Sequence, residues 1–216
     1  MFEHSLKNAY IGEYDTPPSE YQKVEYIQST GTQWINTWYN PDNNTNVECK
    51  VNMQPWATYQ FPRVFWVRNW QSWTSERDFC LQWDRDNKQF VAVTYNNSDH
   101  SYQIMSSTLA DNTDYVVKQT NTQLLVNWVS QWTVGTKTFS ISYPVWLFND
   151  NQAGTDFDRK AKMKLYRFKM YNWTTLVRNF VPCYRKSDSV IWLYDLVNDV
   201  FYTNSWTWTF TKWPNT

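Results

Sequence analysis

Short runs of residues that favour β-strands follow one another along most of the chain. The segment 47–53 alternates strictly between apolar and polar residues, so that Val47, Cys49, Val51 and Met53 would share one face of a strand. Clusters of Asn, Asp, Ser and Pro separate such runs. No segment carries apolar residues at helical spacing over the length of a helix. The pattern therefore predicts an all-β chain in which helix is a minor component.

Runs of this kind, rich in Val, Ile, Thr, Tyr and Phe, occur roughly a dozen times. Many short strands joined by loops of a few residues are typical of two antiparallel sheets packed face to face. We therefore predict a two-sheet jelly-roll sandwich. The expected strands cover residues 47–53, 64–67, 79–83, 89–95, 102–105, 115–119, 123–126, 138–142, 145–148, 162–171, 176–182, 190–195 and 200–203.

The chain has 216 residues, which is the size of one large all-β domain. Pro17 and Pro18 set an extended joint, so we expect residues 1–18 to be a lead-in strand and linker and residues 19–216 to form one jelly-roll domain. Basic and acidic residues both number 20, and no basic run occurs, which argues against nucleic acid as a partner. The mean hydropathy of -0.70 and the lack of a long apolar run or secretory signal predict no membrane insertion.

Glycine and tryptophan occur in unusual numbers. Ordinary glycine usage of about 7% predicts roughly 15 glycines, whereas the chain has 4 glycines and 15 tryptophans. Many of the tryptophans follow Asn, or lie among Ser, Thr and Gln, at places where a turn needs a positive φ. This group comprises Trp70, Trp73, Trp128, Trp132, Trp173, Trp206 and Trp208 and, with weaker signals, Trp38, Trp66, Trp192 and Trp213.

A residue other than glycine costs about 1–2 kcal/mol in the left-handed region. We therefore hypothesise that many of these tryptophans correspond to UGA codons that the source organism reads as glycine. The alternative is a tryptophan-rich surface that binds sugars, but such a surface gives no reason for indoles at turn positions. Trp34, Trp83 and Trp146 lie in strand-like runs and are interpreted as genuine, while Trp56 is left open.

Two parts of the chain resemble the ends of a known domain. Residues 19–37, SEYQKVEYIQSTGTQWINT, are similar to the opening of a concanavalin A-like lectin/glucanase domain, close to the laminin G-like modules of phage tail and bacterial surface proteins. Residues 176–188, 193–197 and 201–204 resemble the end of the same domain, so that the resemblance covers residues 19–213. This family usually carries glycine where the chain has Trp38, Trp192, Trp206, Trp208 and Trp213.

The resemblance implies a concanavalin A-like jelly roll that is either a carbohydrate-binding or adhesive module or a glucanase. Laminarinase-type glucanases of this superfamily carry the pattern Glu-x-Asp-x-x-Glu, because retaining hydrolysis needs two carboxyl groups about 5–5.5 Å apart. The nearest candidate here begins with Glu76 and Asp78, but the position of the last Glu in the pattern is occupied by Leu81. Neither His4 nor His100 occurs in a sequence pattern that pairs a histidine base with a Ser or Cys nucleophile. We therefore predict that the chain is not an enzyme.

No cofactor is expected. Residues 83–87 could present oxygen ligands to calcium, but they lack the spacing of a dedicated calcium loop, so a plain turn at Asp86 and Asn87 is favoured and calcium is supported by no motif. Cys49, Cys80 and Cys183 are odd in number and far apart, which fits neither a disulfide framework nor a zinc site. We interpret the three cysteines as buried apolar residues.

The function predicted from the sequence is recognition of carbohydrate or another cell-surface ligand, as part of a phage tail or bacterial surface assembly that residues 1–18 would join. The expected location is thus a virion tail or the outside of a bacterium. The alternatives are a structural decoration domain that contacts only protein and a degenerate glycoside hydrolase. Ligand binding is predicted at the outward residues of one strand and their neighbours: Arg77, Asp78, Gln82, Trp83, Asp84 and Tyr95.

Overall fold

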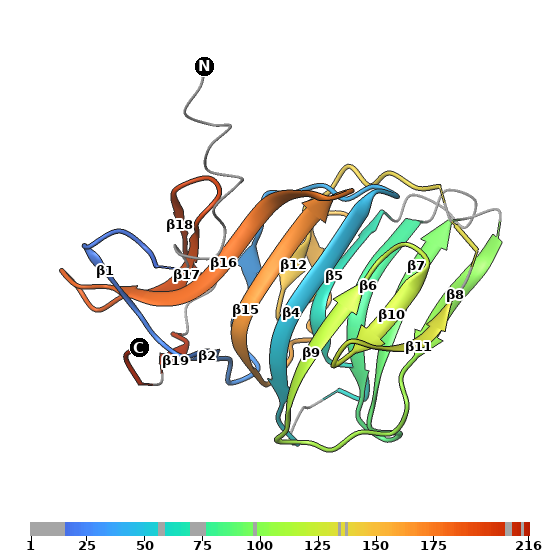
Figure 1. Ribbon diagram of the computed structural model, residues 1–216, viewed down its shortest axis with the longest axis horizontal. Coiled ribbons are helices and arrows are strands. Elements are labelled where there is room, and N and C mark those ends of the chain that lie inside the picture. Colours follow the sequence, from blue (N-terminus) through green and yellow to red (C-terminus); the bar gives the residue numbers. More distant parts are fainter. Residues whose placement is uncertain are drawn as a thin grey trace.

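Two sheets packed face to face make up the described chain (Figure 1). The computed structural model describes residues 16–55, 59–69, 77–96, 99–133, 135–136, 138–205, 209–212 and 214–216. These residues contain no helix, and hence no helix that could span a membrane. The all-β sandwich predicted from the sequence is thereby confirmed, without the minor helix expected beside it in the described part. The proposed lead-in segment lies mostly outside the described residues.

The larger sheet is antiparallel throughout. Its main path runs in the order β11 (Val129–Thr133), β10 (Gln123–Val126), β9 (Asp114–Gln119), β4 (Thr45–Met53), β15 (Met163–Asn172), β16 (Thr175–Arg185), β17 (Ile191–Asp195) and β18 (Val200–Tyr202). Three short strands extend it: β1 (Tyr21–Lys23) on β16, β2 (Ile27–Gln28) on β15, and β19 (Thr211–Lys212) on β2.

The smaller sheet is antiparallel except where β13 meets β5. Its path runs in the order β14 (Thr155–Asp156), β13 (Asn151–Gln152), β5 (Arg63–Asn69), β6 (Arg77–Asp84), β7 (Gln89–Asn96) and β8 (Asp99–Met105). The short strand β12 (Trp146–Leu147) pairs with both β5 and β3 (Ile35–Asn36).

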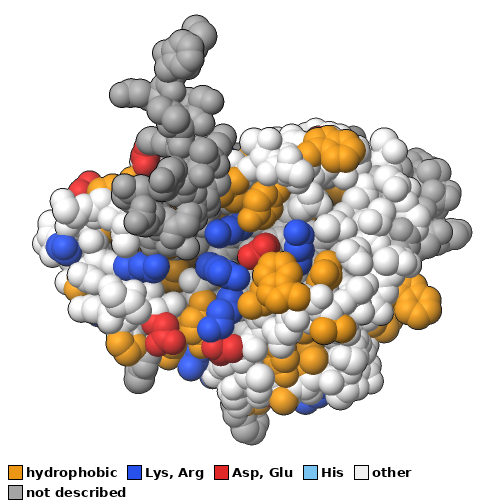
Figure 2. All heavy atoms as spheres, in the orientation of Figure 1, with side chains coloured by type: hydrophobic (Ala, Val, Ile, Leu, Met, Phe, Trp, Pro, Cys, Tyr) orange, Lys and Arg blue, Asp and Glu red, His pale blue; other side chains and the backbone are white. Residues whose placement is uncertain are grey.

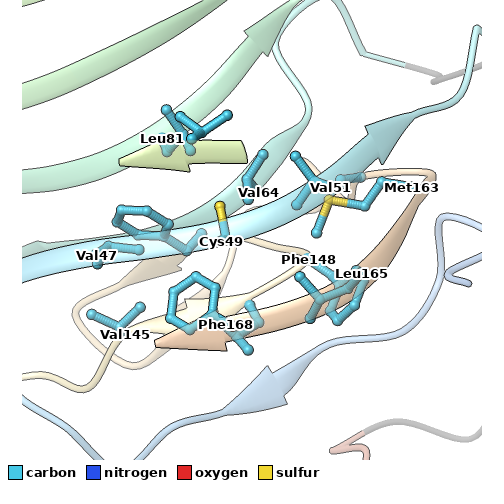
Figure 3. Close-up of a cluster of buried hydrophobic side chains, with 14 of the residues drawn as sticks. Val47, Cys49, Val51, Val64, Leu81, Val145, Phe148, Met163, Leu165 and Phe168 are labelled. Atoms are coloured by element: carbon cyan, nitrogen blue, oxygen red, sulfur yellow. The ribbon is translucent and has the colours of Figure 1, made fainter. Parts of the chain in front are cut away.

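The main core lies between the two sheets (Figure 3). In β4, Val47, Cys49, Val51 and Met53 are buried, as the alternating pattern predicts. They pack with side chains of β15 and of the smaller sheet, such as Phe168, Val64 and Leu81. Cys49, Cys80 and Cys183 are free and buried, which confirms their interpretation as apolar residues.

One predicted strand, residues 138–142, does not form. Phe139 and Ile141 are buried as an apolar run requires, but Ser140 makes only an isolated bridge to Asp42. The segment therefore contributes to the core as a loop. Conversely, strands of two or three residues, such as β13 and β14, are too short to leave an alternating pattern in the sequence.

Two tryptophans occupy the glycine positions of tight hairpin turns. Asn127 and Trp128 have φ values of 49° and 68° and form the two-residue loop between β10 and β11, because Val126 pairs with Val129. Positive φ at both central residues is the mark of a type I′ turn, for which Asn-Gly is the preferred sequence. Trp173, with a φ of 55°, is the first of the two residues that connect β15 and β16. A type II′ turn takes glycine there.

Trp38 also has a positive φ, of 52°. The three side chains project into solvent, with exposures of 72% for Trp38, 57% for Trp128 and 70% for Trp173. Nothing in the core therefore compensates for their backbone strain. The backbone at these three positions agrees with the turn interpretation made from the sequence.

Three other tryptophans do not fit the turn interpretation. Trp132 lies in strand β11, and Trp66 and Trp192 are buried in β5 and β17. None of the three has a positive φ. The small polar neighbours of Trp132 mark an exposed edge strand and not a turn. Trp56, Trp70, Trp73, Trp206, Trp208 and Trp213 lie outside the described residues.

We expect the substitutions Trp128→Gly and Trp173→Gly each to raise the melting temperature by roughly 2–4 °C, because each relieves about 1 kcal/mol of left-handed strain. Trp146→Gly is the matched control, since Trp146 is 6% exposed and lies in β12; this change should lower the melting temperature. Thermal unfolding followed by circular dichroism measures all three. A fall in melting temperature for both turn variants would contradict the strain argument.

Candidate functional site

The outer face of the smaller sheet carries its own group of buried side chains. Successive residues of a strand point to opposite faces, and Phe65 and Phe79 belong to the main core, so Trp66 and Cys80 point away from it. In the register of the sheet, Trp66 lies opposite Cys80, which lies opposite Val93. The buried apolar cluster on this face consists of Trp66, Cys80, Val91 and Val93.

Three arginines surround the indole ring of Trp66. The guanidinium carbon lies 4.2 Å from the ring centroid in Arg63, 5.6 Å in Arg159 and 5.9 Å in Arg68. Cations are attracted to the face of an indole by its quadrupole. Arg63 is only 4% exposed, whereas the side chain of Arg159 is 44% exposed. With two nearby carboxylates, these residues form what we call the arginine cluster: Arg63, Trp66, Arg68, Asp78, Asp150 and Arg159.

Asp78 joins the cluster from the neighbouring strand, where it lies opposite Arg68. Its carboxylate accepts a hydrogen bond from Nε1 of Trp66. Burial raises the pKa of Asp78 to about 6, against the opposing effects of Arg63 and of the indole hydrogen bond. Asp78 thus gains or loses its proton in the mildly acidic range, and the charge of the arginine cluster changes with it.

Arg63 and Asp150 of the cluster keep unused hydrogen-bonding capacity. Among the described residues, Nε and Nη1 of Arg63 are buried without a hydrogen-bond partner, and so is Oδ2 of Asp150. The nearest cation to Oδ2, Nε of Arg159, is 3.9 Å away. Burial lowers the pKa of Arg63 and raises that of Asp150. Nearly all buried polar groups in proteins have a hydrogen-bond partner, and a bound water molecule is the ordinary partner for atoms such as these.

The arrangement is suited to binding and offers no nucleophile. The ring of Trp66 is 3% exposed and lies beneath Arg63, so the groups that this arrangement offers to a ligand are arginine donors and carboxylate acceptors, which can hold the hydroxyls of a sugar. Burial raises the pKa of the Cys80 thiol far above its ordinary value, which leaves it unreactive. Leu81, which stands where a glucanase would carry its second catalytic carboxylate, is fully buried in the main core. Glu76 lies outside the described residues, within which no group of His, Cys, Asp or Glu side chains could hold a metal ion.

The structure places two of the predicted site residues on this outer face. Asp78 belongs to the arginine cluster, and Gln82 lies opposite Arg63 in the register. Asp84 closes the β6–β7 hairpin instead, since its carboxylate accepts hydrogen bonds from the backbone N–H groups of Asp86 and Asn87, at 3.1 Å and 3.2 Å. Residues 84–87 are thus the plain turn that the sequence favoured over a calcium loop.

The other predicted site residues lie elsewhere. Trp83 is 1% exposed in the main core, where its ring packs edge-on against Phe90 at 4.9 Å, so it cannot contact a ligand on the outer face. The same alternation that turns Gln82 outward turns Trp83 inward. Arg77, at the beginning of β6, is two residues before Phe79 and therefore lies on the same face of the strand as Phe79, the face opposite to that of Asp78. The backbone of Tyr95 lies opposite Asp78, but its side chain is outside the described part.

Sequence reasoning missed Arg63, Trp66, Asp150 and Arg159. Trp66 occurs in a continuous apolar run, in which no alternation shows which side chain faces outward. Asp150 and Arg159 lie on either side of the short strands β13 and β14 and reach the site only through the fold. A single sequence contains no signal that would bring these residues together with Asp78.

No protein-family model matches the chain, and no curated protein matches it. Among solved structures, a candidate carbohydrate-binding protein of Bacteroides ovatus superposes with a TM-score of 0.56 at 11% identity, over 88% of this chain and 60% of that chain. Domains LG4-5 of the mouse laminin α1 chain superpose with a TM-score of 0.53 at 9% identity, over 88% of this chain and 46% of that chain. The CBM40 of a Ruminococcus gnavus sialidase has a TM-score of 0.49 at 13% identity, over 69% of this chain and 91% of that chain.

The chain spans about half the length of the B. ovatus and laminin structures that it resembles. At these identities the likeness concerns the fold. It confirms the fold that the terminal segments implied: the chain is a concanavalin A-like jelly-roll sandwich.

We expect the contribution of Asp78 to the stability of the protein to fall as the pH rises from about 4 to 6, and Asp78→Asn to remove this contribution from the pH profile. The folded state keeps the Asp78 proton up to a pH of about 6, whereas the unfolded state releases it near its ordinary value of 3.8. Deprotonation in this window therefore favours the unfolded state, by about 1–3 kcal/mol. Urea unfolding at several pH values measures the difference between the two proteins.

The control for this experiment is Asp86→Asn, because Asp86 is 54% exposed at the β6–β7 turn. It should leave the pH profile of the wild type unchanged. Parallel profiles for the wild type and Asp78→Asn would show that Asp78 titrates normally.

Proposed function

We propose that the chain is a non-enzymatic recognition module that binds carbohydrate at the arginine cluster. The observation that carries this proposal is a pair of buried groups without hydrogen-bond partners in the arginine cluster: Nε and Nη1 of Arg63, whose guanidinium lies over the ring of Trp66, and Oδ2 of Asp150, which faces Arg159 at 3.9 Å. Sugar hydroxyls can accept hydrogen bonds from arginine donors and donate to carboxylate oxygens. The likeness to a candidate carbohydrate-binding protein of the same fold adds support.

Arg159 is the residue to change, because its side chain is 44% exposed and its replacement should leave the fold intact. We expect the wild type to bind defined sugars on a glycan array, in a manner competed by the free sugar, and Arg159→Gln to weaken the best interaction about tenfold. The control is Arg85→Gln, which removes an arginine of similar exposure at the β6–β7 turn. Equal loss in both variants, or no glycan bound by the wild type, would refute the proposal.

Two alternative functions remain open to the same experiments. A decoration domain that contacts only protein would give no sugar-competed signal on the array. A degenerate glycoside hydrolase would turn over a β-glucan, and Glu76→Gln would abolish this turnover. Asp78 alone, with Leu81 in the core, argues for binding over hydrolysis.

We also propose that the module belongs to a phage tail or a bacterial surface assembly, which residues 1–18 would join. The resemblance of residues 19–37 to modules of such proteins supports this placement. Pro17 and Pro18 precede β1, with a turn at Ser19 and Glu20 between them and the strand, and a Pro-Pro pair suits an extended connection. Copurification of tail or surface components with the natural protein would test this.

We infer, in addition, that the natural residue is glycine at positions 38, 128 and 173, encoded by UGA. Trp38, Trp128 and Trp173 combine a positive φ with an exposed side chain, and glycine is the residue that such backbone favours. This inference bears directly on the binding site. Without it, the exposed indoles of Trp38, Trp128 and Trp173 would be obvious platforms for sugar rings; with it, the strongly exposed indole left among the described residues is that of Trp132, at 66%.

The codons and the protein itself test the inference. We expect UGA at positions 38, 128 and 173, and UGG at positions 34, 83 and 146. Peptide masses of the protein from its natural source should then show glycine at the first three positions and tryptophan at the others. UGG codons or tryptophan masses at position 128 or 173 would end the idea.

A further inference from the structure

The outer face of the larger sheet gathers basic residues that are scattered in the sequence. Strands β9, β4 and β15 lie side by side there, and their register places outward-pointing residues in three rows (Figure 1). Figure 2 shows Lys and Arg side chains grouped on this face, with hydrophobic and acidic side chains among them. The rows read Lys118–Glu48–Lys169, Val116–Lys50–Arg167 and Asp114–Asn52–Lys164.

These rows, which we call the basic face, contain five cations and two carboxylates in a chain whose net charge is zero. Glu48 pairs with Arg167 at 3.2 Å, and Asp114 pairs with Lys50 at 3.0 Å. Lys118, Lys164 and Lys169 have no ion-pair partner among the described residues. Within these rows the cations exceed the carboxylates by three, an excess that the sequence, lacking any basic run, did not reveal; Glu25 is a further acidic neighbour, near Tyr166.

Asp114, one of the two carboxylates, is held in place within the basic face. Its Oδ1 accepts hydrogen bonds from Nδ2 of Asn52 and from the hydroxyl of Tyr166, both at 2.8 Å. Burial alone would raise the pKa of Asp114, but these hydrogen bonds and Lys50 hold it below its ordinary value. The charge pattern of the basic face is thus fixed by its neighbours.

Two tyrosine rings lie within the basic face. Nζ of Lys50 is 4.2 Å from the ring centroid of Tyr166, and Nζ of Lys164 is 4.5 Å from that of Tyr26. The two rings contact each other edge to face at 5.2 Å. Ammonium groups next to aromatic rings match a ligand that combines anionic groups with the apolar faces of sugar rings.

We propose that the basic face binds a linear acidic polysaccharide, whose sugars carry carboxylate or sulfate groups. Neighbouring strands are about 4.8 Å apart, and outward residues repeat about every 6.7 Å along a strand, so the cations form a broad, shallow grid. Such a grid suits an extended polymer better than a small ligand. Lysines, which dominate the grid, act as point charges without the fork geometry that selects a single phosphate. This surface lies on the opposite side of the sandwich from the arginine cluster and does not depend on it.

Dextran sulfate is the probe, with uncharged dextran of the same length as the ligand control. We expect the wild type to bind dextran sulfate but not dextran, with an affinity that falls steeply between about 50 and 300 mM salt. The double variant Lys118→Gln/Lys169→Gln should lose about tenfold in affinity. Arg85→Gln/Lys186→Gln removes the same charge elsewhere on the surface and should change affinity less than twofold.

Equal effects of the two double variants would overturn the proposal, because binding would then follow net charge alone. Tighter binding of poly(dT) or of anionic lipid vesicles, lost through the same lysines, would assign the basic face to a different partner and refute the choice of polysaccharide. Arg159→Gln should leave dextran sulfate binding unchanged. Failure at this surface is therefore distinguishable from failure at the arginine cluster.

Discussion

The structure depends on the burial of one side of each sheet against the other. Full burial of an aliphatic or aromatic side chain contributes about 1.5–3 kcal/mol, whereas a surface ion pair contributes less than about 1 kcal/mol. In β4, the inward residues Val47, Cys49 and Val51 therefore set the register, and the outward residues Glu48 and Lys50 take the neighbours that this register gives them. The arginine cluster and the basic face both consist of side chains on the outer faces of the sheets, which do not take part in the packing of one sheet against the other.

The two outer faces differ in how far their charged residues are buried. On the smaller sheet, cations and carboxylates lie around an indole and are largely removed from water, so that their pKa values move and some donors remain without partners. On the larger sheet the charges are partly exposed and fixed by hydrogen bonds, as for Asp114. Burial makes the first face suited to a small ligand with precise hydrogen bonds. Exposure makes the second face sensitive to the charge of a long partner.

The fold could be predicted from the sequence because many short runs rich in Val, Ile, Tyr and Phe are separated by turn residues, and because one of them, β4, alternates between apolar and polar residues from Val47 to Met53. The site could be predicted only in part. Gln82 and Asp84 were predicted to point outward because they alternate with apolar residues of β6, and Asp78 and Trp83 were included as their neighbours; the structure places Trp83 in the main core. Arg63 and Arg159 meet in space through the pairing of β5 with its neighbours, and no linear pattern encodes that meeting.

A final consequence concerns the irregularity in β15. Leu165 pairs with Val51 and Arg167 with Lys50, so Tyr166 is one residue more than β4 can match. Leu165 and Phe168 point inward on either side of this bulge, while Tyr166 and Arg167 are both partly exposed. Loss of Tyr166 alone would leave Leu165 inside, Arg167 outside and Phe168 inside, as in a regular strand. Deletion of Tyr166 would therefore leave the inward and outward residues of β15 on their present faces, both before and after the bulge. The side chain at position 166 can thus change without a change in the packing of the two sheets.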